Sequence, residues 1–282
     1  MAIVRVLFSC HDRPGIVASI AEAIFTVGGN IIQSDQHTTD PRGGDFFMRV
    51  EFDLPEPVDR VGLAAAVERL SHAFEMQVTV HFANEKKRVA IFVSRLDHCL
   101  VDLLWRWKAG ELAMTIPLVV SNHPDLKPVV EGFGLPYAVF PITAATKRER
   151  EEELLMRLEG QVDLIILARY MQILSGPFVA RYPGRIINIH HSFLPAFIGG
   201  RPYDQAAQRG VKIIGATAHY VTDELDEGPI IEQDVARVSH RDGVPDLIRK
   251  GKDIEKAVLA RAVRWHLEDR LLVYRNRTVV FG

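Results

Sequence analysis

The order of apolar patterns over residues 3–83 is the feature that most constrains how this chain can fold. Stretches of alternating or β-branched apolar residues exchange with stretches whose apolar residues recur at helical spacing. They predict a strand, a helix, two strands, a second helix and a further strand, the βαββαβ order of the ferredoxin-like fold. The predicted strands are residues 3–10, 31–39, 45–52 and 77–82, and the predicted helices are 16–27 and 61–74.

A polar run at residues 84–87 separates this pattern from a second α/β series. Domain boundaries fall in such segments, so we predict one domain at residues 1–84 and another at 85–282. The second series predicts an open, Rossmann-like α/β sheet, which binds ligands beyond the carboxyl ends of its strands. A charge run at residues 147–153 is expected to be a solvated helix face. The predicted strands are 88–94, 116–121, 137–140, 164–168 and 185–189, and the helices are 99–109, 126–133, 147–158 and 176–181.

Composition restricts the possible partners. With 282 residues, 48% of them hydrophobic and 25% charged, the chain is expected to be soluble and large enough for two domains. A net charge of -2 with scattered lysines and arginines indicates no nucleic-acid partner. No uninterrupted apolar run is long enough to cross a bilayer, so no membrane partner is predicted either. The first residues resemble a strand rather than a signal peptide, so we expect a cytoplasmic protein. Cys10 and Cys99 fit a reducing compartment, and Cys99 beside His98 is interpreted either as a reactive pair or as a buried thiol.

Asn188 and His190 are the first candidates for catalysis. Residues two apart in a strand point to the same face, so these side chains should emerge together at the end of the strand over 185–189. Asp226 follows a later strand and can reach them from its turn. An amide donor, an imidazole and a carboxylate together can hold a carbonyl oxygen, activate a water and move a proton.

A metal site is the alternative interpretation of this histidine-rich region. His190, His191, His219 and Asp226 have the side-chain types that zinc prefers. However, neighbouring residues in a strand face opposite ways, so His190 and His191 cannot easily share one ion. We therefore predict a site without metal, in which His191 has a structural role.

Several segments, in order, resemble the formyltetrahydrofolate-dependent formyltransferase and deformylase family: residues 167–175, 188–197, 215–220 and 226–233. The resemblance covers nearly the whole chain, and residues 190–197, 215–220 and 226–233 are most similar to the hydrolytic, deformylase members. It implies hydrolysis of 10-formyltetrahydrofolate to formate and tetrahydrofolate, which supplies formate for purine synthesis and balances folate pools. It also implies catalysis by Asn188, His190 and Asp226, with folate as substrate and no cofactor. The residues expected to bind the substrate are Arg169, Met171, Gln172, Leu174, His219, Thr222 and Leu225.

The alternative functions are a transferase and a sensor or scaffold without catalysis. A transferase that passes the formyl group to an amine such as glycinamide ribonucleotide needs a loop that cradles phosphate, usually rich in glycine. Here the corresponding residues 94–100 lack glycine and contain Asp97. Water is therefore the simplest acceptor. A sensor or scaffold without catalysis is disfavoured by the intact set of Asn188, His190 and Asp226.

The motif Asp-Arg-Pro-Gly at residues 12–15, followed by Gly-Gly-Asn at 28–30, resembles an ACT domain. ACT domains often bind amino acids between paired copies, although many serve only assembly. We expect Asp12 to cap the first helix, Pro14 to lie in its first turn and residues 28–30 to end it. The resemblance implies a homo-oligomer and an effector held by Asp12, Gly15 and Asn30, with glycine or methionine as candidates.

Overall fold

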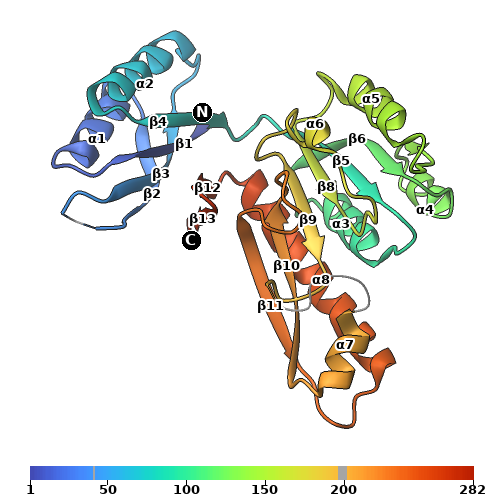
Figure 1. Cartoon of the computed structure of the whole chain (residues 1–282). Helices are drawn as coiled ribbons and strands as arrows, with labels where there is room; N and C mark the ends of the chain where they lie inside the picture. The colour runs from blue at the N-terminus through green and yellow to red at the C-terminus, as the bar shows by residue number, and fades with distance from the viewer. Residues whose placement is uncertain (41, 196–201) are drawn as a thin grey trace. The chain divides into compact units, whose positions relative to one another are not determined.

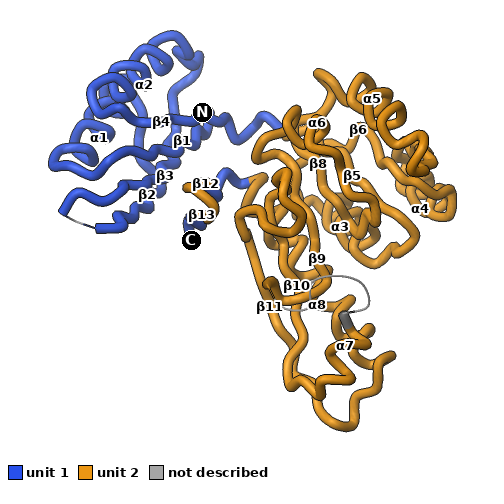
Figure 2. Tube along the Cα trace, viewed as in Figure 1, with its two compact units in different colours: residues 1–86, 268–272, 279–282 blue, residues 87–267, 273–278 orange. Residues whose placement is uncertain are grey.

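The computed structural model describes residues 1–40, 42–195 and 202–282 and shows two compact units (Figure 2). Unit 1 contains Met1–Lys86, Glu268–Leu272 and Val279–Gly282, and unit 2 contains Lys87–Leu267 and Val273–Thr278. The described part of the chain has no helix that is long and apolar enough to cross a membrane.

Unit 1 has the predicted ferredoxin-like order (Figure 1). Its sheet has the strand order β2-β3-β1-β4, with antiparallel neighbours throughout. The two helices place isoleucine and leucine side chains, including Ile16, Ile20 and Leu63, against the aromatic and β-branched residues of the sheet. The elements are β1 (Ala2–His11), α1 (Ile16–Thr26), β2 (Asn30–Thr38), β3 (Asp45–Leu54), α2 (Arg60–Phe74) and β4 (Gln77–Phe82).

The start of α1 differs from the prediction. Gly15 is the N-cap, with a left-handed φ of 96°, and Pro14 precedes the helix instead of lying in its first turn. Asp12 does not act as the cap: its Oδ2 accepts a hydrogen bond from Thr38 Oγ1 at 2.7 Å, which ties the loop to the end of β2. Glycine adopts a left-handed backbone without steric cost, so it can begin the helix without a side-chain cap. The other end agrees with the prediction, since Gly28 has a φ of 76°.

Residues near the C-terminus complete unit 1, which no sequence pattern had indicated. Arg49 on β3 is 2% exposed. Its Nε donates to the carbonyl oxygen of Asp269 at 3.0 Å, and its Nη2 donates to that of Glu268 at 3.1 Å. The Asp269 carboxylate faces Arg5 at 3.6 Å and His81 at 3.5 Å. The segment after the last helix is thus bound to the sheet by buried charged groups.

Replacing Arg49 should destabilise unit 1. Arg49→Ala removes the cation that pairs with Glu51 at 2.8 Å and leaves the Asp269 and Glu268 carbonyl groups without their donor. Breaking a buried charged network of this kind costs about 3 kcal/mol in the free energy of unfolding. Urea unfolding followed by circular dichroism measures the loss. Arg69→Ala, an exposed position on α2, is the control; equal unfolding midpoints for both variants would show that the Arg49 contacts contribute nothing.

Unit 2 is the predicted open α/β sheet, with strand order β11-β10-β9-β8-β5-β6-β7. The strands from β9 to β7 run parallel, whereas β10 and β11 are antiparallel. All strands and helices predicted between residues 88 and 189 are present, within a few residues at their ends. The elements are β5 (Lys87–Val93), α3 (His98–Lys108), β6 (Met114–Ser121), α4 (Lys127–Glu131), β7 (Tyr137–Val139), α5 (Lys147–Leu158), β8 (Leu164–Leu167), α6 (Gly176–Val179), β9 (Ile186–His190), α7 (Pro202–Arg209), β10 (Ile213–Tyr220), β11 (Ile230–Arg237) and α8 (Val244–Leu267), followed by the hairpin of β12 (Leu271–Tyr274) and β13 (Arg277–Val280).

The charge run on α5 is not wholly a solvated face. Glu151 is buried, 4% exposed, and accepts a hydrogen bond from the amide of Ser175 at 3.2 Å. It precedes Leu154 and Leu158 at helical spacing, so it shares their buried face. The prediction holds for Arg148 and Glu152, which pair on the exposed side.

Candidate active site

The end of β9 brings the candidate catalytic residues to the carboxyl edge of the parallel strands. Asn188 and His190 lie on the same face of β9, as the strand period predicts. The antiparallel neighbour β10 places His219 directly opposite Asn188. Asn188 Nδ2 lies 3.1 Å from His219 Nε2, within hydrogen-bond distance. The sheet register therefore adds His219 to the pair found from the sequence.

Asp226 reaches the pair from the turn between β10 and β11. Its Oδ2 lies 3.2 Å from His190 Nδ1, and its Oδ1 lies 3.6 Å from His219 Nε2. Asp226 has a φ of 59°, in the left-handed region that aspartate tolerates better than most residues. Gly228 lets the turn return to β10, because a Cβ there would lie 1.8 Å from the carbonyl oxygen of Tyr220. The tight turn thus delivers the carboxylate between two imidazoles.

Hydrogen bonds within this group keep the Asp226 carboxylate ionised. The hydrogen bond from His190 Nδ1 holds the pKa of Asp226 well below its ordinary value, although partial burial acts in the opposite direction. His219 Nδ1 lies 2.9 Å from the carbonyl oxygen of Tyr220, which can only accept, so Nδ1 carries a proton. In the neutral ring, Nε2 is then an acceptor for the Asn188 amide.

A cleft of about 780 Å³ in unit 2 contains this group. The size is within the range of small-molecule sites. Its walls include apolar side chains such as Leu96, Ile173 and Val221. The structure brings together all the residues predicted for catalysis and substrate binding, because each of them lines the cleft: Asn188, His190, Asp226, Arg169, Met171, Gln172, Leu174, His219, Thr222 and Leu225.

Other cleft residues were not found from the sequence. They include His98 on α3, Tyr203 on α7, and Lys252 and Glu255 on α8. Glu255 is 1% exposed and lies on the apolar face of α8. A carboxylate at an apolar position of a predicted helix is the sequence signal that could have identified it. The other residues become neighbours only through the fold, because they come from distant segments.

Burial shifts the pKa values of His191 and Cys99 in the direction that favours their neutral forms. Burial, with the positive charge of Arg169 nearby, lowers the pKa of His191 to about 4, so this ring is neutral near pH 7. Cys99 is buried, and its burial raises the pKa of the thiol well above the ordinary value. The interpretation of Cys99 as a buried thiol is therefore favoured over a reactive pair.

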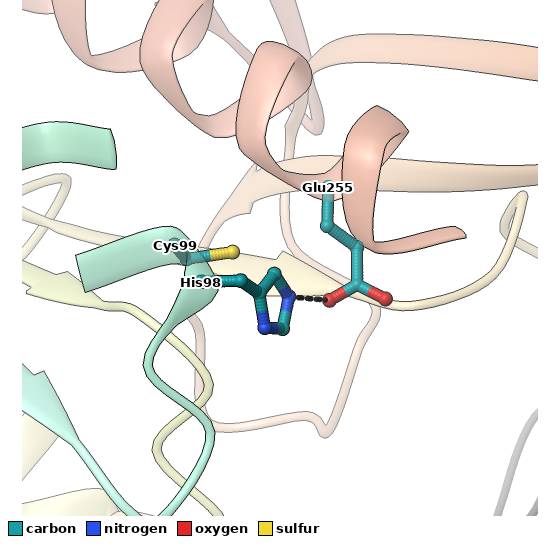
Figure 3. A group of neighbouring side chains, drawn as sticks. All are labelled: His98, Cys99 and Glu255. Carbon is teal, nitrogen blue, oxygen red and sulfur yellow. Dashed lines mark hydrogen bonds and ion pairs between the residues drawn. The ribbon is translucent and has the colours of Figure 1, made fainter. Parts of the chain in front are cut away.

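One group in the described part of the chain has enough close ligand types for a metal ion: His98, Cys99 and Glu255 (Figure 3). It is not the group that the sequence offered as an alternative metal site, which consists of His190, His191, His219 and Asp226. Glu255 is already bonded to His98 at 2.8 Å and Tyr203 at 2.7 Å, and Arg169 Nε lies 3.5 Å from it. A guanidinium so close to the carboxylate opposes a second cation.

The effector residues predicted in unit 1 do not all meet. Asp12 and Gly15 line a cleft of about 500 Å³ together with Arg13, Gln36 and Thr38. Asn30 is not among the residues that line this cleft. It is the first residue of β2, and six residues of extended strand, roughly 20 Å, separate it from Gln36.

Comparisons with known proteins cover the same two parts of the chain. Residues 87–263 match the family described as formyl transferase, and residues 4–70 match the ACT domain family. The chain is 55% identical to a formyltetrahydrofolate deformylase of Synechocystis, over 98% of this chain and 97% of the relative. Its structure resembles a formyltetrahydrofolate deformylase from Pseudomonas syringae, with a TM-score of 0.95 and 46% identity over 100% of this chain and 95% of that one.

A transferase is a more distant match. Glycinamide ribonucleotide transformylase 1 from Symbiobacterium toebii has a TM-score of 0.66 and 31% identity, covering 72% of this chain and 97% of its own. Two further points concern the sequence motifs. Residues 196 and 197 of the motif at 190–197 lie outside the described residues. The motifs at 167–175, 215–220 and 226–233 lie in unit 2, and those at 12–15 and 28–30 lie in unit 1.

Proposed function

Because the chain belongs to the formyltetrahydrofolate deformylase family, we propose that it hydrolyses 10-formyltetrahydrofolate with Asn188, His190 and Asp226 as the catalytic residues. The deformylase relatives match 98% and 100% of this chain, whereas the transformylase match covers 72% of it. The observation that carries the assignment of these residues is the convergence of an amide, two imidazoles and an ionised carboxylate in one cleft.

Asn188 and His190 stabilise the formyl oxygen as it becomes an anion. Asn188 Nδ2 carries two hydrogens; His219 accepts one, so the other is available to the substrate. His190 directs Nδ1–H to Asp226, and its buried Nε2 has no partner among the described residues. With a proton on Nε2, the ring donates a hydrogen bond to the oxyanion while Nδ1 stays bonded to the carboxylate. Donors placed in advance for developing charge are the largest source of rate enhancement in acyl transfer.

Asp226 receives the proton of the attacking water. The carboxylate positions the water, and the proton moves to it as the bond from oxygen to the formyl carbon forms. A low pKa makes Asp226 a weak base in the free enzyme, but the nearby oxyanion raises that pKa as the reaction proceeds. The proton then passes to N10 as the carbon–nitrogen bond breaks. The ionised Asp226 is regenerated, and the formic acid so formed releases its remaining proton to solvent, which leaves formate and tetrahydrofolate as products.

The folate occupies the side of the cleft formed by residues 169–174 and 221–225. Ser94 Oγ accepts a hydrogen bond from the amide of Met171 at 2.9 Å and so fixes the course of the first segment. The apolar side chains of Leu174, Val221 and Leu225 suit the flat pterin ring, while backbone groups of both segments are available for its polar edge.

Formate release without an added amine tests the function. We expect the purified enzyme to convert 10-formyltetrahydrofolate to formate and tetrahydrofolate, and glycinamide ribonucleotide not to accelerate folate turnover. Exhaustive chelation should leave the rate unchanged, because the proposed residues supply the chemistry without a metal; a catalytic zinc would be required throughout. Formylated glycinamide ribonucleotide as the main product would instead assign the enzyme to the transferases.

Unit 1 is proposed to control and assemble the enzyme. Its match to the ACT domain family supports an amino-acid effector and paired copies of the chain, with glycine and methionine as the first candidates. The cleft beside Asp12 and Gly15 supports a carboxylate and an ammonium group as the parts to be recognised. An effector acts only if its affinity differs between active and inactive states. The cytoplasmic location also stays a prediction.

A further inference from the structure

The α3 and α8 side of the cleft is occupied by a buried network of His98, Arg169, Tyr203 and Glu255, here named the Glu255 network. Glu255 Oε2 lies 2.8 Å from His98 Nε2 and 3.5 Å from Arg169 Nε, and Tyr203 donates its hydroxyl to Oε1 at 2.7 Å. Figure 3 shows the His98 ring extending from the start of α3 to the Glu255 carboxylate on α8. Both carboxylate oxygens therefore have partners.

The network is held in one charge state. Burial of Glu255 acts to raise the pKa of this carboxyl, but the hydrogen bond from His98 and the charge of Arg169 outweigh burial and lower it. A buried carboxylate with both oxygens bonded is strongly oriented, since each lost partner would leave an unpaired charge. His98 is thus fixed by a group that stays ionised at neutral pH.

Gly251 shows that α8 is shaped around Tyr203. A Cβ at this position would lie 1.9 Å from Tyr203 Oη and 2.4 Å from its Cζ. Glycine is unfavourable inside a helix, yet here it stands in the interior of α8. The absent side chain leaves room for the Tyr203 ring to reach Glu255.

His98 lies at a helix start that borders the cleft. It is the first residue of α3, directly after the turn from β5 that follows the strand end. Amide groups at such helix starts receive phosphates. Here the His98 ring fills the space beside Glu255, and the preceding residue Asp97 adds a negative charge at the start of the helix.

The network is also continuous with the catalytic residues. The Tyr203 ring lies 6.3 Å from the ring of His191, which lies 5.1 Å from that of His190. His98, Tyr203 and Glu255 line the same cleft as Asn188 and Asp226. A group bound in the place of His98 would therefore lie in the same cleft as the proposed catalytic residues.

We propose that His98, held by Glu255 and Tyr203, closes the α3 side of the cleft to amine-bearing ribonucleotides and so determines that water accepts the formyl group. The inference rests on the proposed function and names the residue that sets its acceptor specificity. The His98 ring excludes the ribonucleotide in two ways. It fills the space on the α3 side of the cleft, and it is hydrogen-bonded to the Glu255 carboxylate, which could otherwise accept hydrogen bonds from the hydroxyl groups of a ribose.

Binding of glycinamide ribonucleotide separates this idea from the proposed function. Full-length wild type, His98→Ser and Gly251→Ala are titrated with the ribonucleotide by calorimetry, and His72→Ser, an exposed histidine on α2, is the control. Serine removes the ring from the cleft, and the alanine methyl group displaces Tyr203 without touching His98. We expect an affinity gain of about tenfold or more for His98→Ser, equal to about 1.4 kcal/mol, and a smaller gain for Gly251→Ala.

A second measurement follows the products. With 10-formyltetrahydrofolate and the ribonucleotide both present, formylated ribonucleotide should increase relative to formate in the two cleft variants and not in His72→Ser. The proposal is overturned if either variant, shown to be folded by circular dichroism, binds the ribonucleotide no better than the control. Failure of wild type to release formate would instead contradict the proposed function, while the binding comparison would still decide the role of His98.

Discussion

Asp226→Asn should lower kcat by about 100-fold to 10,000-fold while the protein stays folded. The amide keeps the shape of the side chain but carries no charge and cannot accept a proton from water. Loss of a general base alone costs in this range. Steady-state formate release measures kcat, and circular dichroism checks the fold. Glu227→Gln, the exposed neighbour in the same turn, is the matched control and should retain near-normal turnover.

The pKa of Asp226 also fixes the pH at which its charge can be lost. The hydrogen bond from His190 lowers this pKa in the folded protein, so the unfolded chain binds the proton more readily. The resulting stabilisation is present above the unfolded pKa of about 3.9 and is lost as the pH falls toward the folded pKa. Between pH 5 and 8, any change in wild-type rate must then come from another group. Near-normal turnover in folded Asp226→Asn would remove this residue from the mechanism.

Most of the fold up to residue 190 could be predicted from the sequence because its strands and helices have strong apolar periods. The later elements lack that signal. β10 is buried through small residues, Gly215, Ala216 and Ala218, which have weak strand preference. On α8, the buried face includes Gly251 and Glu255, which interrupt the apolar stripe. In β10, close packing of small residues takes the place of large apolar side chains.

Predictions from neighbouring residues in the sequence were wrong where a side chain is bonded to a residue far away in the sequence. Asp12 suits a helix cap by its position, but it bonds to Thr38 on β2, and Gly15 begins the helix. Glu151 lies in a charged run, yet the amide of Ser175 makes its burial possible. The attachment of residues 268–272 to unit 1 depends on Arg49, far away in the sequence.

The candidate site shows the same division. The spacing of Asn188 and His190 gave their shared face, because a strand repeats every two residues. The position of Asp226 beside them depends on the turn that Gly228 permits. The Glu255 network joins residues from α3, α7 and α8 and the segment after β8, so contacts across the fold, and no single motif, define it.

Asn188→Ala and His190→Ala should each lower kcat by about 100-fold to 1,000-fold, because each removes a donor to the oxyanion. The double variant should lose far less than the product of the two effects, since residues that act on one charge are not independent. Ile187→Val, on the opposite and buried face of β9, is the control and should keep its rate. KM for the folate should change much less than kcat in both single variants, because the hydrogen bonds strengthen only in the transition state. If the fold-loss in kcat of the double variant equals the product of the two single fold-losses, Asn188 and His190 act on separate steps.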